Sequence, residues 1–158
     1  MDIQPCGYLP FKVAFEPEDR LILCPAYIFP IEVLERGLMT RMKYLYQTVV
    51  VNGYDGRTTL VDCADVVPVM DFCPDDYGTA ERLELKVSVM AAPEIAEFGS
   101  VPQDCRNWRM IIRNRNVAVN TDKMKLVWHI YAVRGAEVID TFSGERIKSA
   151  GLLGMLFS

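Results

Sequence analysis

Apolar residues recur at helical spacing in one early part of this chain, between residues 30 and 42. Ile31, Leu34, Leu38 and Met42 fall on one helical face. Pro30 stands ahead of them, where the first helical turn tolerates proline. Acidic residues come early in this stretch and basic residues late, the order that the helix dipole favours. The pattern predicts a helix over residues 30–42.

The next stretches have the composition of strands. Residues 44–51 are rich in aromatic and β-branched types, and the Asn-Gly sequence that follows at 52–53 predicts a hairpin with a returning strand over 58–63. Residues 82–90 alternate apolar and polar types, as expected for a strand with one solvated face. Residues 123–133 contain an apolar run that predicts a strand in a sheet interior. Residues 21–29 are also apolar, but Pro25 lacks a backbone donor and predicts an edge or broken strand.

A second helix is expected at the end of the chain, over residues 144–157. The sequence has 158 residues, of which 51% are hydrophobic and 24% charged, which excludes extensive disorder and fits one domain. We therefore predict a single globular domain over residues 1–158. Its class is α+β, with a mainly antiparallel β-sheet and two main helices, at about 30–42 and 144–157.

The cysteines and the first residues bear on the compartment. Five cysteines, an odd number, lie without any CxxC pair, which argues against a zinc ribbon and predicts no metal site. Scattered thiols of this kind are typical of a reducing compartment. The chain starts with an acid, Asp2, rather than the basic residues of a signal peptide, and no apolar stretch reaches the roughly 20 residues of a membrane span. A cytoplasmic location is expected.

Candidate catalytic chemistry is sparse. His129 is the only histidine, and it lies inside an apolar run, which favours a histidine satisfied within a core. The sequence contains no phosphate-binding glycine loop and no nucleophile elbow. The acids between residues 62 and 76 have the spacing of solvated loop acids. We therefore predict no catalytic residue, no cofactor and no enzymatic activity, and we identify no small-molecule substrate.

Charge is unevenly distributed along the chain. Residues 1–105 carry 8 Lys and Arg against 17 acids, whereas residues 106–134 carry 7 against 1, a net charge of +6. Such a concentration attracts the phosphates of anionic lipid or nucleic acid, although a solvated basic face balanced by acids elsewhere would have the same composition. The predicted polyanion-binding residues are Arg106, Arg109, Arg113, Arg115, Lys123, Lys125 and Arg134.

The C-terminal segment, residues 147–157, would be apolar on nearly every face of a helix. A helix of this kind is buried in its own core or covered by a partner. We predict a homo-oligomer in which this segment takes part in self-association or closes the core. The residues concerned are Leu152, Leu153, Met155, Leu156 and Phe157.

The strand at 125–131, the polar connection to 142–148 and the apolar end at 152–157 resemble the C-terminal half of rhabdovirus-type matrix proteins. The earlier order of strand, helix and hairpin is also similar to that fold. The resemblance implies a non-enzymatic viral matrix protein that self-assembles, condenses ribonucleoprotein and lines the inner membrane surface of a virion. Anionic lipid or ribonucleoprotein would be its partner.

Two alternatives to the interpretation as a matrix-type protein remain open at this point. One is a cytosolic module that binds a ligand or a nucleic acid. The other is a regulatory factor that binds one protein partner. Concentration-dependent oligomers and liposome binding favour the matrix-type reading over both.

Overall fold

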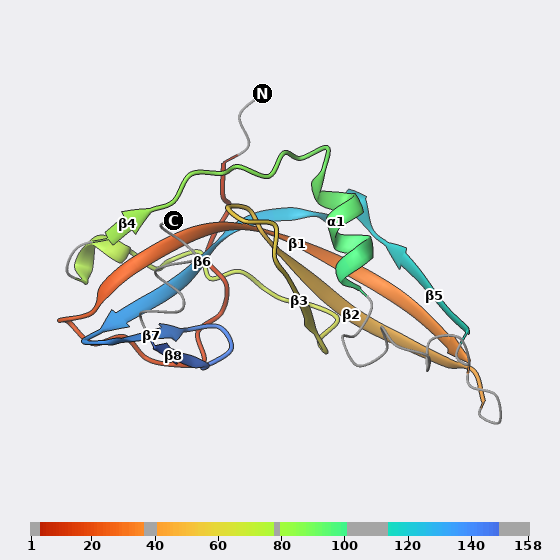
Figure 1. Cartoon of the computed structure of the whole chain (residues 1–158), viewed down its shortest axis with the longest axis horizontal. Helices are drawn as coiled ribbons and strands as arrows, with labels where there is room; N and C mark the ends of the chain where they lie inside the picture. The colour runs from red at the N-terminus through yellow and green to blue at the C-terminus, as the bar shows by residue number, and fades with distance from the viewer. Residues whose placement is uncertain (1–3, 37–40, 78–79, 101–113, 149–158) are drawn as a thin grey trace.

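The computed structural model describes residues 4–36, 41–77, 80–100 and 114–148, which form one curved eight-stranded sheet (Figure 1). The strand order is β3-β2-β1-β6-β7-β8, and every pair along this path is antiparallel. β5 pairs antiparallel with β1, and β4 pairs parallel with it. The predicted mainly antiparallel sheet is therefore confirmed.

The bounds of the elements are as follows. The strands are β1 (Arg20–Arg36), β2 (Lys43–Asn52), β3 (Thr58–Val61), β4 (Ala80–Arg82), β5 (Asn114–Val119), β6 (Lys125–Arg134), β7 (Glu137–Asp140) and β8 (Arg146–Lys148). The described residues also contain one α-helix, α1 (Ala92–Gly99), and the 3-10 turns η1 (Pro74–Asp76) and η3 (Thr121–Lys123). The β2–β3 hairpin and the strand β6 lie where the sequence predicted them.

The long strand β1 organises the sheet, and each of its two edges is shared by two neighbours. On one edge β4 pairs with Leu21, Ile22 and Leu23, and β2 pairs from Ala26 onward. On the other edge β6 pairs as far as Ile28, and β5 pairs from Ile31 onward. Figure 1 shows β1 arching along most of the molecule, with β7 and β8 near one end and α1 over the other half. The prediction of an edge or broken strand over 21–29 is therefore wrong.

The two prolines of β1 lie where its neighbours change. The Pro25 carbonyl accepts the Gly53 amide at 2.7 Å, so the donor-less nitrogen of Pro25 faces the junction between β4 and β2. The Pro30 carbonyl accepts the Asn120 amide at 2.9 Å, so its nitrogen faces the junction between β6 and β5. A proline is tolerated in this central strand because neither ladder needs a donor at these points.

The predicted helix over 30–42 is wrong. Residues 30–36 belong to β1, residues 41–42 have no regular structure, and 37–40 lie outside the described residues. Ile31 and Val33 are buried while Glu32 between them is exposed, which is the period of two of a strand. Strands pair with this segment on both edges, and this backbone bonding outweighs the helical spacing of its apolar residues.

The second predicted helix, over 144–157, is also contradicted where the chain is described. Residues 146–148 form the strand β8, and 149–157 lie outside the described residues. α1 is instead the one α-helix of the described chain, so the two-helix architecture is corrected to a curved sheet with one short helix. The strand expected over 82–90 is limited to Arg82 at the end of β4.

The sheet has an inner face, which carries the even-numbered residues of β1, and an outer face, which carries the odd-numbered ones. Cross-strand partners share a face, so Cys24, His129 and Asn52 all lie on the inner face. Ile22, Tyr131 and Val138 are buried together on this side.

Two groups of side chains cover the outer face. Near the start of β1, five aromatic rings pack against Leu21 and Leu23, and these rings are Tyr8, Phe11, Phe15, Phe72 and Tyr77. Toward the end of β1, α1 contributes Ala92 and Ala96 to a core with Tyr27 and Phe29. The inner face carries the site described below.

Gly53 in the β2–β3 turn supports a first prediction. A Cβ there would lie 2.7 Å from the Pro25 carbonyl oxygen and 2.6 Å from Leu85 Cδ1, so the turn would have to move away from β1. We expect Gly53→Ala to lower the free energy of unfolding by about 2 kcal/mol, measured by urea denaturation. The control is Gly135→Asn, because no atom lies within 4 Å of a Cβ there and Asn tolerates its φ of 63°. Equal stability of both variants would contradict this account of the turn.

Candidate binding pocket on the inner face

A pocket of about 180 Å³ lies on the inner face between two parts of the sheet. One wall comes from the β2–β3 hairpin, which contributes Asn52, Asp55 and Arg57. The other comes from β6 and β7, which contribute His129, Tyr131 and Asp140. β1 lies between these two parts in the strand order, so the sheet must curl over its inner face for both to line one pocket.

The wall from β6 and β7 is a chain of polar contacts centred on His129. Its Nε2 donates to Asp140 Oδ1 at 2.7 Å, and the Tyr131 hydroxyl lies 3.5 Å from its Nδ1. The rings of His129 and Tyr131 stack with centroids 4.4 Å apart. The register explains this grouping, because Tyr131 pairs directly with Asp140 and His129 precedes it by two residues on the same face. His129 is 6% exposed, so the expectation of a satisfied, buried histidine is confirmed.

Asp140 also holds the turn that follows β7. Its Oδ1 accepts the backbone amides of Phe142 at 3.0 Å and Ser143 at 3.2 Å. Burial would raise the pKa of Asp140, but the hydrogen bond from His129, its charge and the bonds from Ser143 outweigh burial and lower that pKa below its usual value. Asp140 is therefore an ionised group with fixed donors around it.

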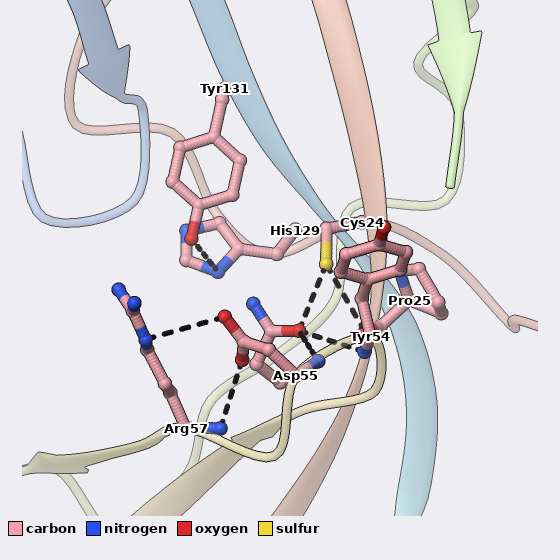
Figure 2. Close-up of polar contacts among 8 residues, drawn as sticks. Cys24, Pro25, Tyr54, Asp55, Arg57, His129 and Tyr131 are labelled. Atoms are coloured by element: carbon pink, nitrogen blue, oxygen red, sulfur yellow. Dashed lines mark hydrogen bonds and ion pairs between the residues drawn. The ribbon is translucent and has the colours of Figure 1, made fainter. Parts of the chain in front are cut away.

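The hairpin wall is held by the side chain of Asn52. Its Oδ1 accepts the amides of Tyr54 at 2.8 Å and Asp55 at 3.1 Å, and the thiol of Cys24 at 3.2 Å. Arg57 donates its backbone amide to Asp55 at 2.9 Å and places its Nε 3.3 Å from the same carboxylate. Figure 2 shows Asp55, Arg57, His129 and Tyr131 facing a common space, with Cys24 beside them.

Tyr131 in the pocket and Cys24 beside it could act as nucleophiles, but both keep their protons. Burial, with the negative charge of Asp55, raises the pKa of Cys24 to about 12, so its sulfur is a thiol near neutral pH. Burial also raises the pKa of Tyr131 well above its usual value. The pocket therefore offers hydrogen-bond donors and acceptors, two internal pairs, Asp55 with Arg57 and Asp140 with His129, and the exposed carboxylate of Glu145.

Sequence reasoning missed this site. In the sequence, Asn52-Gly53 is explained by the hairpin turn alone, and Cys24 is one of five scattered thiols. The signal that would have found the site is the register of β1 with β6, which sets Cys24 opposite His129. A register of this kind is a long-range property that local sequence does not contain.

The predicted polyanion-binding residues that the structure describes do not form one group. Lys123 ends η3 and Lys125 begins β6, whereas Arg134 lies at the far end of that strand, about 30 Å away at 3.3 Å per residue. Arg134 is bonded there to Asp19 at 2.9 and 2.8 Å. Arg115 lies in β5, opposite Glu35 in the register. Three further members, Arg106, Arg109 and Arg113, lie outside the described residues.

The predicted self-association residues, Leu152, Leu153, Met155, Leu156 and Phe157, all lie outside the described residues. Within the described part of the chain, no helix has the length and apolar character needed to cross a membrane. No group of three or more His, Cys, Asp or Glu side chains in those residues could hold a metal ion.

The inner-face pocket thus brings polar groups from two separate parts of the sheet together. The chain matches no protein-family model, no curated protein and no solved structure.

Proposed function

We propose that this chain is a non-enzymatic binding protein whose inner-face pocket holds a small, uncharged, hydroxyl-bearing ligand. The observation that carries the proposal is the convergence of two separate polar walls, from β2–β3 and from β6–β7, on one cavity. Pockets that combine a few fixed polar groups with a concave surface are the usual places for small ligands. This corresponds to the ligand-binding module that the sequence left open as an alternative.

The size of the pocket limits the ligand. A volume of about 180 Å³ equals that of about six liquid waters at about 30 Å³ each. Drug-sized ligands need about 300 Å³ or more. The ligand is therefore a small molecule, or the terminal group of a larger one.

The charges of the pocket favour a neutral ligand. A bound anion would face the carboxylates of Asp55, Asp140 and Glu145, and a bound cation would face the guanidinium of Arg57. Asp55 is paired with Arg57 and Asp140 with His129, and Glu145 is exposed to solvent, so an ionic ligand would gain little and would have to lose its hydration. Hydroxyl groups can donate to and accept from such paired groups without disturbing them.

The non-enzymatic part of the proposal rests on the state of the reactive groups. Cys24 is protonated and donates to Asn52, and Tyr131 retains its proton. An enzyme of the nucleophilic type needs an activated nucleophile beside a base. His129, the candidate base, has Asp140 at one ring nitrogen and Tyr131 at the other.

The test uses saturation-transfer NMR with three probes of similar size: erythritol, acetate and ethylammonium. A ligand this small binds with millimolar affinity, about −4 kcal/mol, which this method detects. We expect transfer to erythritol and little to the two ions. Thr59→Phe, which fills the pocket from the exposed side of β3, should abolish that transfer, and Thr121→Phe on the distant turn η3 should preserve it.

Two results would overturn the proposal. One is the absence of transfer to erythritol in the unmodified protein. The other is equal transfer in the Thr59→Phe variant, which would place the binding elsewhere. The matrix-type role, with anionic lipid or ribonucleoprotein as partner, stays a prediction, and of its basic residues only Lys123 and Lys125 lie close together in the described chain.

A further inference from the structure

Among the described residues, the first half of β2 has one edge without a partner strand, called the open edge below. β2 covers Lys43–Asn52, but β3 pairs only with residues 48–51. Within the described residues, no strand pairs with residues 43–47 on this edge. Edges of this kind are templates for another strand, because their backbone groups lack partners.

The register shows which backbone groups face the open edge. Asn52 donates its amide to Arg57 across the hairpin, so the even-numbered residues of β2 direct their backbone groups away from β1. The same alternation makes Tyr44 and Tyr46 present an N–H and a C=O each at the open edge. Leu45, between them, directs its backbone groups toward β1, where it pairs with Val33.

The side chains beside this edge are also exposed. Tyr44 is 65% exposed and Tyr46 is 56% exposed, and both lie on the inner face. An open edge and two exposed aromatic rings therefore lie together within residues 43–47.

We propose that two copies of this chain pair through this edge as antiparallel strands centred on Leu45. Tyr44 of one copy then faces Tyr46 of the other, and the two pairs exchange four backbone hydrogen bonds. Each pair also sets two tyrosine rings side by side on one face of the joined sheet. The pairing is two-fold symmetric, as expected for a dimer of identical chains.

The same register is compatible with the side chains that flank Tyr44 and Tyr46. It places Lys43 of the second copy opposite Gln47, on the outer face, so that a cation meets a neutral polar side chain. No like charges face each other between residues 43 and 47. β2 begins at Lys43, so the second copy leaves the edge before it reaches β3.

The test is sedimentation velocity over a range of protein concentrations. We expect a reversible dimer, and Tyr46→Pro should weaken it at least tenfold because the proline removes one outward N–H in each copy. The bonds between β1 and β2 do not use that N–H, so the fold should persist, as checked by circular dichroism. The matched control, Tyr46→Thr, keeps the backbone donor and should keep most of the dimer.

A second variant keeps the proposal testable if Tyr46→Pro fails to fold. Leu45→Cys brings the two cysteines face to face only in the proposed register, with Cα atoms about 4.5 Å apart, which suits a disulfide. In a background with Cys6, Cys63, Cys73 and Cys105 changed to Ser, it should form a covalent dimer on mild oxidation. A monomer at every concentration, or a dimer unaffected by Tyr46→Pro and not linked by Leu45→Cys, overturns the proposal.

Discussion

Arg134→Met is expected to lower the free energy of unfolding by about 3 kcal/mol near neutral pH. Arg134 donates two hydrogen bonds, of 2.9 and 2.8 Å, to the carboxylate of Asp19. The side chain of Asp19 is 1% exposed, and its other partner is the Glu16 amide at 2.9 Å. Removing the guanidinium would leave a buried charge without its counter-charge, which is the costly way to break such a pair. Urea denaturation at pH 7 measures the loss.

A second ion pair provides the control for this prediction. Arg146 lies 3.5 Å from Glu137, with the two side chains 60% and 50% exposed. Exposed pairs of this kind contribute less than about 1 kcal/mol, so Arg146→Met should change stability little. The double variant Asp19→Asn with Arg134→Met should regain part of the loss, since no buried charge remains. Equal effects of Arg134→Met and Arg146→Met would contradict the argument.

The effect of Arg134 should also depend on pH. The hydrogen bonds from Arg134 lower the pKa of Asp19 below its usual value. A carboxylate with a lowered folded-state pKa stabilises the fold above its unfolded pKa, near 3.8, and this contribution is lost as the pH falls through the folded-state value. The difference between the unmodified protein and Arg134→Met should therefore shrink below about pH 4.

The elements that the sequence predicted correctly are those with local signals. The β2–β3 hairpin follows from its Asn-Gly turn between β-branched runs, and β6 from its continuous apolar run. Residues 30–36 carry two patterns at once, since Ile31 and Leu34 have helical spacing while Ile31 and Val33 have strand spacing. The choice between them is made by β2 and β5, which bond to both edges of the segment.

Pro25 is a second case in which the local sequence does not determine the structure. In a sequence, a proline inside an apolar run argues against a central strand, because a ladder donor is missing. In the fold, the missing donor falls between β4 and β2, where no bond is needed. The site was beyond reach for a related reason, because its two walls meet only through the curl of a sheet built from distant segments.

Asp140 supports the last prediction, in which two substitutions separate its two roles. Asp140→Asn keeps an oxygen that can accept the Phe142 and Ser143 amides but loses the charge beside His129. We expect it to lower the free energy of unfolding by about 1.5 kcal/mol at pH 7. Asp140→Ala loses both roles and should cost about 3 kcal/mol. Urea denaturation compares the two variants.

The pH dependence identifies the charged role of Asp140. Burial acts to raise its pKa, but the hydrogen bond and charge of His129 and the bonds from Ser143 outweigh it, so the folded-state pKa is lowered. The stabilisation by Asp140 is thus fully present above the unfolded pKa near 3.8 and is lost as the pH falls through the lower folded-state value. The stability of the unmodified protein should fall toward that of Asp140→Asn below about pH 4, because the amide does not titrate. If the stability difference between the unmodified protein and Asp140→Asn stays constant from pH 7 to pH 3, Asp140 acts through the turn alone, and its negative charge beside His129 does not stabilise the fold.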